Sequence, residues 1–416
     1  MGSLRHPLAA VLGGCRLAYD VCIIGAGLVG LGVARALSES RPGIGIVIVD
    51  KEATVAAHQS SHNSGVAHSG LYYRPGSLKA RLCVEGRRRL KDYCSVAGIA
   101  FEESGKLVIA TKPSELEPLA ELERRGRANG LSGLTRVDGE GIRELEPAAV
   151  GLQALHVPEA GVVDFPAVAA RLAHDLLDDG AHIRTEFGVE TIEHHEGGAR
   201  IRSADQEIQA RVVVNCAGLY SDLVAAVAGV RSQVRIVPFR GEYYTLEPEA
   251  KHLVRGLIYP VPDPRFPFLG VHFTRRIDGS VEVGPNAVLA VGREHYRDAD
   301  PDWGELRRTI GDRGFRRLVM KHWRTGATEM IRSRSRSLYA RSAQALVPAI
   351  RPEHLIPGGA GIRAQAVSPD GALLDDFVIE EAGSTVHVLN APSPGATASM
   401  AIGAHVAAIA ARHLGR

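Results

Sequence analysis

The chain has 416 residues, 45% hydrophobic and 23% charged, a normal composition for a globular protein large enough to bury a sizeable ligand. A formal net charge of +2 gives no reason to expect a nucleic-acid partner, and no apolar run of about twenty residues predicts a transmembrane helix. The five cysteines form no C-x-x-C pair and no zinc-like spacing, so we expect a reducing compartment and no metal site.

The first elements after an 18-residue N-terminal segment predict a dinucleotide-binding unit. An apolar strand at 19–24 leads into Gly25-Ala26-Gly27-Leu28-Val29-Gly30, and a helix is expected from residue 31. Gly25 permits the turn, Gly27 lets the backbone approach a pyrophosphate, and Gly30 allows close packing of helix on strand. The alternative is a glycine-rich turn before an ordinary helix.

A second apolar run, 44–49, ends at Asp50, about twenty residues beyond the last glycine, where a carboxylate can bind a ribose diol. This register favours the dinucleotide unit over a chance turn. Because the residue is acidic, it favours FAD or NAD over NADP. We count the adjacent Lys51 among the cofactor-binding candidates.

The next segment, 62–73, reads H-N-S-G-V-A-H-S-G-L-Y-Y and carries hydroxyl, imidazole, amide and phenol groups on a glycine-rich backbone. Such a loop is suited to holding a polar ligand beside the dinucleotide unit. Its first part supplies four cofactor-binding candidates, and the residue before it a fifth: His62, Asn63, Ser64, Gly65 and Ser61.

The middle of the chain continues with alternating helix and strand patterns. Helices are expected at 77–98, 113–129, 166–177 and 220–227, and strands at 105–110, 182–192 and 210–214. The last strand ends in N-C-A-G, a small-residue turn that brings backbone close to a ligand, so Ala217 and Gly218 join the cofactor candidates.

From residue 234 to 291 the pattern changes to short β-type runs broken by proline and glycine, which predicts a mostly antiparallel sheet. Helical segments are expected between 303 and 345, a hairpin-like stretch at 360–363 and a strand at 386–390. The turn 391–395 then leads into a final helix that we expect to return to the cofactor. There is no repeat or low-complexity linker, so we expect two interleaved domains.

Long strings of this sequence resemble known families. One set of strings is shared at the level of a superfamily: G-A-G-L-V-G at 25–30, Asp50, N-C-A-G at 215–218, G-I-R at 361–363 and S-P-D-G at 368–371. The more specific ones are the loop 62–73, V-P-F-R-G-E-Y-Y at 237–244, F-P-F-L-G-V-H-F-T at 266–274, V-G-P-N-A-V-L-A at 283–290 and N-A-P-S-P-G-A-T at 390–397. From about residue 19 onward the chain resembles the FAD-dependent D-amino-acid-oxidase-like superfamily and, within it, the L-2-hydroxyglutarate dehydrogenase/oxidase family. Two departures are Ala67, where a β-branched residue is usual, and 331–336, which matches no family motif.

The resemblance implies an α/β fold in which an FAD-binding Rossmann-like domain is interleaved with a mostly antiparallel β-sheet substrate domain that carries helices. We expect an N-terminal tail or short targeting segment over 1–18. The expected FAD-binding parts are 19–86, 155–232 and 346–416, and the expected substrate-domain parts are 87–154 and 233–345.

The resemblance also implies that FAD takes a hydride from C2 of L-2-hydroxyglutarate, giving 2-oxoglutarate, and passes electrons to a quinone, an electron-transfer protein or oxygen. No cysteine resembles an attachment point, so we expect noncovalent FAD. The expected location is cytoplasmic, with peripheral contact to the inner membrane through 332–341 as an open question, or mitochondrial if residues 1–18 are a transit peptide. The alternatives are an amine or amino-acid oxidase, a glycerol-3-phosphate type dehydrogenase, or a noncatalytic flavoprotein subunit.

This chemistry needs a base, a carboxylate clamp and a shielded flavin face. His68 is the first candidate for the base and His272 the second; a structural histidine is an equal alternative for each, and His62 we assign to the cofactor. Arg363 is the first candidate for a bidentate carboxylate clamp, and Arg240 is a second candidate, for the distal carboxylate, with an ion pair to Glu242 as the alternative.

The remaining candidates come from tyrosines and from the last turn. Tyr72, Tyr73 and Tyr259 could donate phenol hydrogen bonds, or serve only in packing. The turn before the final helix would present N–H groups to the flavin carbonyl edge, or merely begin a proline-capped helix. The other cofactor candidates are Val189, Gly361, Pro394, Gly395, Ala396 and Thr397.

Overall fold

The computed structural model describes residues 18–263, 270–296, 301–333 and 335–415. The expectations for 1–17 and for part of the string 266–274 lie outside these residues. Among the described helices, none combines the length and the apolarity that crossing a bilayer requires.

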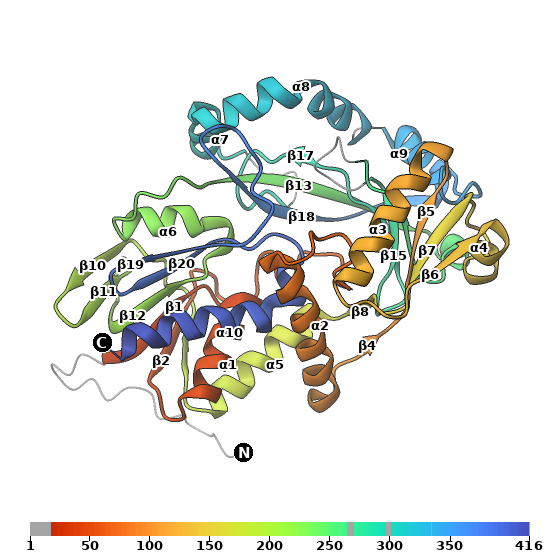
Figure 1. Ribbon diagram of the computed structural model, residues 1–416. Helices are drawn as coiled ribbons and strands as arrows, with labels where there is room; N and C mark the ends of the chain where they lie inside the picture. The colour runs from red at the N-terminus through yellow and green to blue at the C-terminus, as the bar shows by residue number, and fades with distance from the viewer. Residues whose placement is uncertain (1–17, 264–269, 297–300, 334, 416) are drawn as a thin grey trace, which may run out of the picture.

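The dinucleotide unit forms one layer built on a parallel sheet (Figure 1). Its parallel strands lie side by side in the order β9 (His182–Arg184), β2 (Ile46–Val49), β1 (Ala18–Ile24), β12 (Glu207–Asn215), β20 (Thr385–Asn390). The antiparallel strands β10 (Thr191–His195), β11 (Gly198–Arg202) and β19 (Val378–Ala382) extend this sheet. Its helices are α1 (Leu28–Ser40), α2 (Leu78–Ala97), α5 (Phe165–Asp178), α6 (Ser221–Val227) and α10 (Gly395–Leu414).

Glycines let the last helix return beneath the first strands. A Cβ on Gly32 of α1 would lie 2.6 Å from the carbonyl oxygen of Ser399, and one on Gly86 of α2 would lie 2.5 Å from Cα of Ala398. Contacts this short exclude larger residues, so α10 packs directly on α1 and α2. The N-terminus of α10 is thereby brought beside the first βα unit, as expected.

The second layer is a nine-stranded sheet that is antiparallel except for one pair, which confirms the expected mostly antiparallel sheet. Its path is β17 (Val288–Leu289), β13 (Arg235–Leu246), β16 (Val281–Gly284), β15 (His272–Arg275), β14 (Leu257–Pro260), β5 (Lys106–Ala110), β7 (Gln153–Val157), β6 (Thr135–Asp138), and β18 (Leu355–Val367) also pairs with β13. Its helices are α3 (Leu116–Ala128), α4 (Gly139–Leu145), α7 (Trp303–Gly311), α8 (Arg313–Ser333) and α9 (Arg336–Gln344). A small third sheet joins β3 (Val66–Ala67), β8 (Gly161–Val163) and β4 (Phe101–Glu102).

The chain passes between the two layers several times, because strands of both sheets alternate along the sequence. Interleaved domains remain our description of this arrangement, and their boundaries are a proposal. Since β18 pairs with β13 over most of its length, we place the last boundary after Val367 rather than after 345.

Two local expectations were wrong. The run 182–192 forms two strands, β9 and β10, because Glu186 adopts φ +56° and the N–H of Phe187 bonds to the carbonyl of Asp50, which turns the chain away from the sheet. The stretch 360–363 is not a hairpin but lies inside β18, where its backbone pairs with β13. The helices expected at 77–98 and 166–177 are confirmed as α2 and α5.

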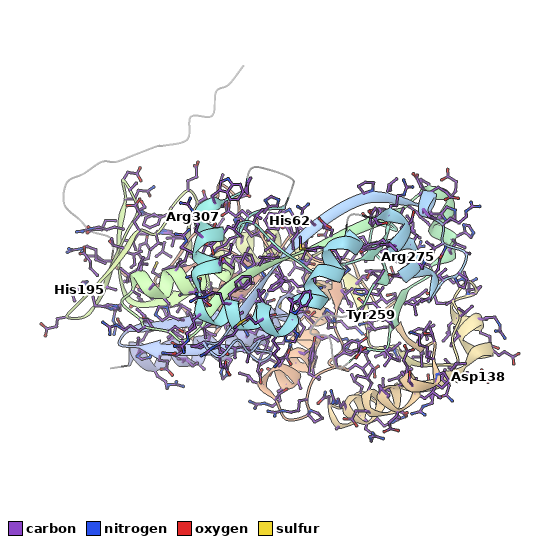
Figure 2. All side chains as sticks on the ribbon, turned by 90° about the horizontal axis from the view of Figure 1, so that it is seen from above. His62, Asp138, His195, Tyr259, Arg275 and Arg307 are labelled. Atoms are coloured by element: carbon purple, nitrogen blue, oxygen red, sulfur yellow. The ribbon has the colours of Figure 1, made fainter. Side chains whose placement is uncertain are left out.

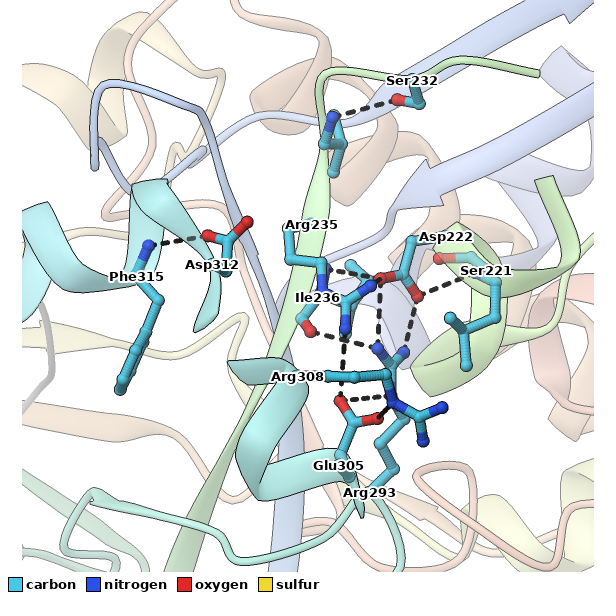
Figure 3. Close-up of polar contacts among 12 residues, drawn as sticks. Ser221, Asp222, Ser232, Arg235, Ile236, Arg293, Glu305, Arg308, Asp312 and Phe315 are labelled. Atoms are coloured by element: carbon cyan, nitrogen blue, oxygen red, sulfur yellow. Dashed lines mark hydrogen bonds and ion pairs between the residues drawn. The ribbon is translucent and has the colours of Figure 1, made fainter. Parts of the chain in front are cut away.

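A buried ion-pair network joins the layers (Figure 3). Arg293 makes a bidentate contact with Asp222 of α6, at 2.6 and 3.1 Å, and its Nε lies 3.0 Å from Glu305 of α7. Arg235 of β13 lies 3.5 Å from Asp222 and 3.8 Å from Glu305. The side chains of Arg293, Asp222 and Glu305 are 2–4% exposed, so each charge depends on the others for compensation.

Candidate cofactor and substrate site

A cavity of about 1230 Å³ is lined by residues from both layers. Typical small-molecule pockets measure about 300–1,000 Å³, so this one has room for a dinucleotide together with a small substrate. Figure 2 shows His62 and Tyr259, which both line it, in the middle of the molecule, whereas Asp138 and His195 lie at opposite ends.

One end of the cavity is formed by the glycine turn. Gly25 adopts φ +108°, and a Cβ there would lie 2.4 Å from the carbonyl oxygen of Cys216, so the turn packs on the N-C-A-G segment. Helix α1 begins next to Gly27 with no side-chain cap and no acidic residue in its first turn. The Ser60 hydroxyl accepts the first N–H of the helix, that of Leu28, and the N–H groups that follow at such a helix start suit a pyrophosphate, so this end fits a dinucleotide. Gly30 does not line the cavity, but a Cβ there would lie 2.0 Å from the Gly25 carbonyl oxygen, consistent with its expected packing role.

Asp50 lines the same end of the cavity. One carboxylate oxygen accepts a hydrogen bond from the Ala26 N–H at 2.7 Å, and the other accepts one from the Glu52 N–H at 3.0 Å. These contacts hold the carboxylate in place while leaving lone pairs for a ribose diol. Other expected cofactor-binding residues also line the cavity: Lys51, Val189, Ala217 and Gly218.

The polar loop contributes both lining residues and residues that shape it. His62, Asn63 and Ser64 line the cavity, whereas Ser61 and Gly65 do not. The Asn63 amide donates to two backbone carbonyls at 3.1 and 2.8 Å, and its oxygen accepts from the Gly65 N–H at 2.9 Å. Its side chain therefore folds the loop rather than facing a ligand.

Ser60, which the sequence reasoning missed, belongs to the cofactor end as well. Its hydroxyl accepts a hydrogen bond from the Leu28 N–H at 3.0 Å, at the start of α1. The loop is therefore attached directly to the helix that would hold the pyrophosphate.

A second helix N-terminus faces the cavity at α10. The helix begins at Gly395 with no side-chain cap and no acidic residue in its first turn, and residues 394–397 line the cavity. The Thr397 hydroxyl accepts from the His68 N–H at 3.1 Å and donates to the Val66 carbonyl at 3.2 Å. The expected flavin-binding turn and the polar loop are thus joined by one side chain.

Two histidines lie at the other end of the cavity. His272 is 6% exposed, its ring stacks on Tyr259 at 4.0 Å, and its Nδ1–H donates to the Gly270 carbonyl at 2.8 Å. That bond leaves Nε2 with a free lone pair. Burial lowers the pKa of His272 to about 3, so its imidazole is neutral near pH 7.

His68 is partly exposed and also lines the cavity. Its Nε2 lies 3.5 Å from the Ser393 hydroxyl, and its Nδ1 is buried with no partner within the described part of the chain. Desolvation, followed by the positive charge of Lys106, lowers its pKa well below the usual value. It too is neutral near pH 7.

Strand alternation separates the two arginine candidates. The residues of the paired strands that line the cavity are Gly241 and Tyr243 of β13 and the consecutive residues Gly361, Ile362, Arg363, Ala364 and Gln365 of β18. Arg240 is not among the lining residues, because it lies one position out of phase with Gly241, and its Nε is 3.7 Å from Glu242. The geometry thus favours the ion-pair alternative for Arg240. A Cβ on Gly361 would lie 2.6 Å from the His62 carbonyl, so glycine is required there.

Tyr72, Tyr73 and Tyr259 all line the cavity, as expected for the substrate end. The Tyr72 hydroxyl is buried and has no partner within the residues that the structure describes. An orphaned polar atom at the wall of a cavity is suited to a polar ligand.

The sequence reasoning missed three further residues at this end. Tyr243 lines the cavity, and burial raises its pKa to about 12. Lys79 lines it too, with Nζ 2.7 Å from Asp375, and Lys106 is buried behind Tyr72 and Tyr259. The sequence does carry a sign of two of these residues. Tyr243 stands two residues after Gly241, the spacing of residues on one face of a strand, and Lys106 is a charged residue at the start of the apolar strand KLVIA.

Comparison with known proteins agrees with this geometry. The family model described as FAD dependent oxidoreductase matches residues 20–409. An L-2-hydroxyglutarate dehydrogenase of Indibacter alkaliphilus is 44% identical over 93% of this chain and 98% of its own length. The mitochondrial L-2-hydroxyglutarate dehydrogenase of Homo sapiens is 42% identical over 94% of this chain and 88% of its own length.

Solved structures share the fold at lower identity. The dithionite-reduced L-alpha-glycerophosphate oxidase from Mycoplasma pneumoniae, with FAD bound, has a TM-score of 0.77 and 22% identity and covers 96% of this chain and 95% of its own. Glycine oxidase from Geobacillus kaustophilus has a TM-score of 0.71 and 19% identity, with 95% of each chain covered. The glycine turn, the uncapped helix starts and these matches together show that the chain belongs to the FAD-dependent oxidoreductases and, within them, to the L-2-hydroxyglutarate dehydrogenase family.

Proposed function

We propose that this protein oxidises L-2-hydroxyglutarate to 2-oxoglutarate with bound FAD as the hydride acceptor. The observation that carries the proposal is one cavity in which a guanidinium, Arg363, and two neutral imidazoles lie beyond a dinucleotide site. The identity of 42–44% to curated L-2-hydroxyglutarate dehydrogenases supports this particular substrate.

FAD, when bound, supplies the acceptor for the hydride that leaves C2. The residues that would hold it are the α1 turn, Asp50 and residues 394–397, because these place two uncapped helix starts and a ribose-binding carboxylate along one cavity. Noncovalent attachment is part of the proposal, since the described cysteines Cys22, Cys83, Cys94 and Cys216 are all buried.

Arg363 would bind one carboxylate of the substrate through two parallel N–H donors. Tyr72 and Tyr259 line the same region, and their phenols would donate to the substrate. Burial raises the pKa of both tyrosines, so they stay protonated and keep a hydrogen to donate.

The hydroxyl of C2 must lose a proton as the hydride leaves. His68 is our first candidate to accept it, because it is partly exposed and its backbone N–H donates to the Thr397 hydroxyl, which holds it at the α10 end. His272 is the second candidate, through its free Nε2. Both are neutral near pH 7, so either can take the proton without first losing one.

The electron acceptor is proposed to be a quinone, an electron-transfer protein or oxygen. Peripheral membrane contact through 332–341, and a cytoplasmic or mitochondrial location, belong to the same proposal. Residue 334 of that stretch lies outside the described residues.

The test is anaerobic flavin reduction. The purified holoprotein is mixed separately with L-2-hydroxyglutarate, D-2-hydroxyglutarate and glycine while the visible flavin band is recorded. We expect bleaching by the L-isomer alone. Bleaching by glycine would instead indicate an amine oxidase, and a flavin that no substrate bleaches would refute an oxidase of either kind.

A further inference from the structure

Lys106 is a buried cation without a matching anion. It is the first residue of β5 and only 2% exposed, although lysine is almost never fully buried unless paired. Its Nζ lies 4.1 Å from the ring centre of Tyr259 and 5.3 Å from that of Tyr72. Its closest described contacts are these two rings, and among the described residues no carboxylate forms an ion pair with it.

The two rings beneath this ammonium group are themselves walls of the substrate end. Tyr259 and Tyr72 line the cavity, and Tyr259 stacks on His272 at 4.0 Å. An aromatic ring attracts a cation on its face, which accounts for the position of Nζ but not for its missing counter-charge. Burying an ammonium without an anion is unfavourable, and a carboxylate in the cavity would relieve that penalty.

We propose that Lys106 is a positioning residue for the substrate, and that its ammonium group complements the charge of a bound dicarboxylate across the rings of Tyr259 and Tyr72. This inference rests on the proposed function, because it takes the substrate to be a dicarboxylate. It adds a second positive charge to that of Arg363, on the opposite side of the tyrosine wall.

The proposal has a consequence for protons. Burial lowers the pKa of Lys106 to about 7, so above that pH the amine of the free protein is mostly uncharged. A bound dianion favours the charged form and raises this pKa. Binding above about pH 7 must therefore draw a proton from solution.

The other titratable groups around Lys106 do not change charge in this window. Burial raises the pKa of the Cys83 thiol of α2 to about 12 and those of both tyrosines above their usual value of 10. The nearby imidazoles titrate below their usual 6.5, with His272 at about 3. Proton uptake between pH 7 and 9 would therefore report on Lys106.

The experiment measures glutarate binding to the oxidised holoprotein by calorimetry at about pH 8, in two buffers of different ionisation enthalpy. Glutarate is a dicarboxylate without the C2 hydroxyl, so it cannot be oxidised. A group with a pKa of about 7 is about 10% protonated at pH 8, so we expect uptake of up to about 0.9 proton per site.

Variants of Lys106 test whether this residue is the group that takes up the proton. Lys106→Met should abolish the uptake and weaken glutarate binding about tenfold near pH 7. Lys106→Arg carries a permanent charge, so it should bind glutarate without proton uptake. If the Met variant loses FAD, the Arg variant alone tests whether Lys106 takes up the proton. Lys112→Met, an exposed lysine six residues further on, is the matched control and should behave as the unmodified protein.

Glutarate binding without proton uptake, or an uptake that persists in both Lys106 variants, would overturn the proposal and leave the dicarboxylate site intact. Failure of L-2-hydroxyglutarate to reduce the flavin would count against the proposed function instead. The two failures are thus separate observations.

Discussion

Replacement of Arg363 by lysine tests the carboxylate clamp, and the paired strand supplies its control. Arg363 on β18 lines the cavity, whereas Arg240 on β13 lies on the opposite face with Glu242 at 3.7 Å. A lysine at 363 keeps the charge but loses the planar fork, and with it about one charge-assisted hydrogen bond, or about 2 kcal/mol. That corresponds to a decrease of about 30-fold in kcat/KM.

The same change at position 240 should alter kcat/KM less than about threefold, because lysine can maintain an ion pair that is partly exposed to solvent. Both variants would be assayed by steady-state oxidation of L-2-hydroxyglutarate, with flavin content measured from the visible spectrum. Equal effects at the two positions, or a larger one at 240, would refute the argument from strand alternation.

Three further outcomes follow from the geometry. Arg293→Met removes the bidentate partner of Asp222 and the closest cation to Glu305, and Arg235, at 3.5 and 3.8 Å from these carboxylates, compensates them only in part. The variant should therefore lower the free energy of unfolding by about 2–3 kcal/mol, whereas Arg171→Met at an exposed helix pair should leave it nearly unchanged; equal denaturant midpoints for the two variants would contradict this. Gly25→Ala places a Cβ 2.4 Å from the Cys216 carbonyl at φ +108°, so the purified variant should carry little flavin, and a fully yellow protein would show that flavin binding does not require glycine at this turn. Burial lowers the pKa of His272 to about 3 and the pKa of His68 well below its usual value, so either base becomes protonated only as pH falls through those low values. Flavin reduction at saturating substrate should therefore not slow between pH 8 and 6, and stopped-flow absorbance traces can check this.

Some of the cofactor site could be predicted from sequence because its signals are local. The turn at 25–30 and Asp50 are separated by one βα unit, so the spacing along the chain determines their separation in space. The structure accordingly places Gly27 and Asp50 on the same cavity. Asn63 lines the cavity, but its side chain binds the loop's own backbone, which no local signal in the sequence indicated.

The substrate end was harder to predict because its residues come from distant segments. Tyr243 and Arg363 are brought together only because β13 pairs with β18, a strand more than a hundred residues further along the chain. A shift of one residue in the position of β13 would place Arg240 in the cavity instead. Nothing local to Lys106 indicates that two tyrosine rings from other segments cover its ammonium group.

The sequence by itself determined the dinucleotide unit and the mostly antiparallel second sheet, because glycine spacing and hydrophobic periodicity act over a few residues at a time. The family followed from the resemblance of longer sequence strings, which can be compared without knowing the fold. Only the tertiary structure decided which arginine faces the cavity, that both imidazoles are neutral, and that Lys106 has no counter-charge among the described carboxylates. Those properties depend on strand register and on burial, and both are set by contacts between segments that are far apart in the chain.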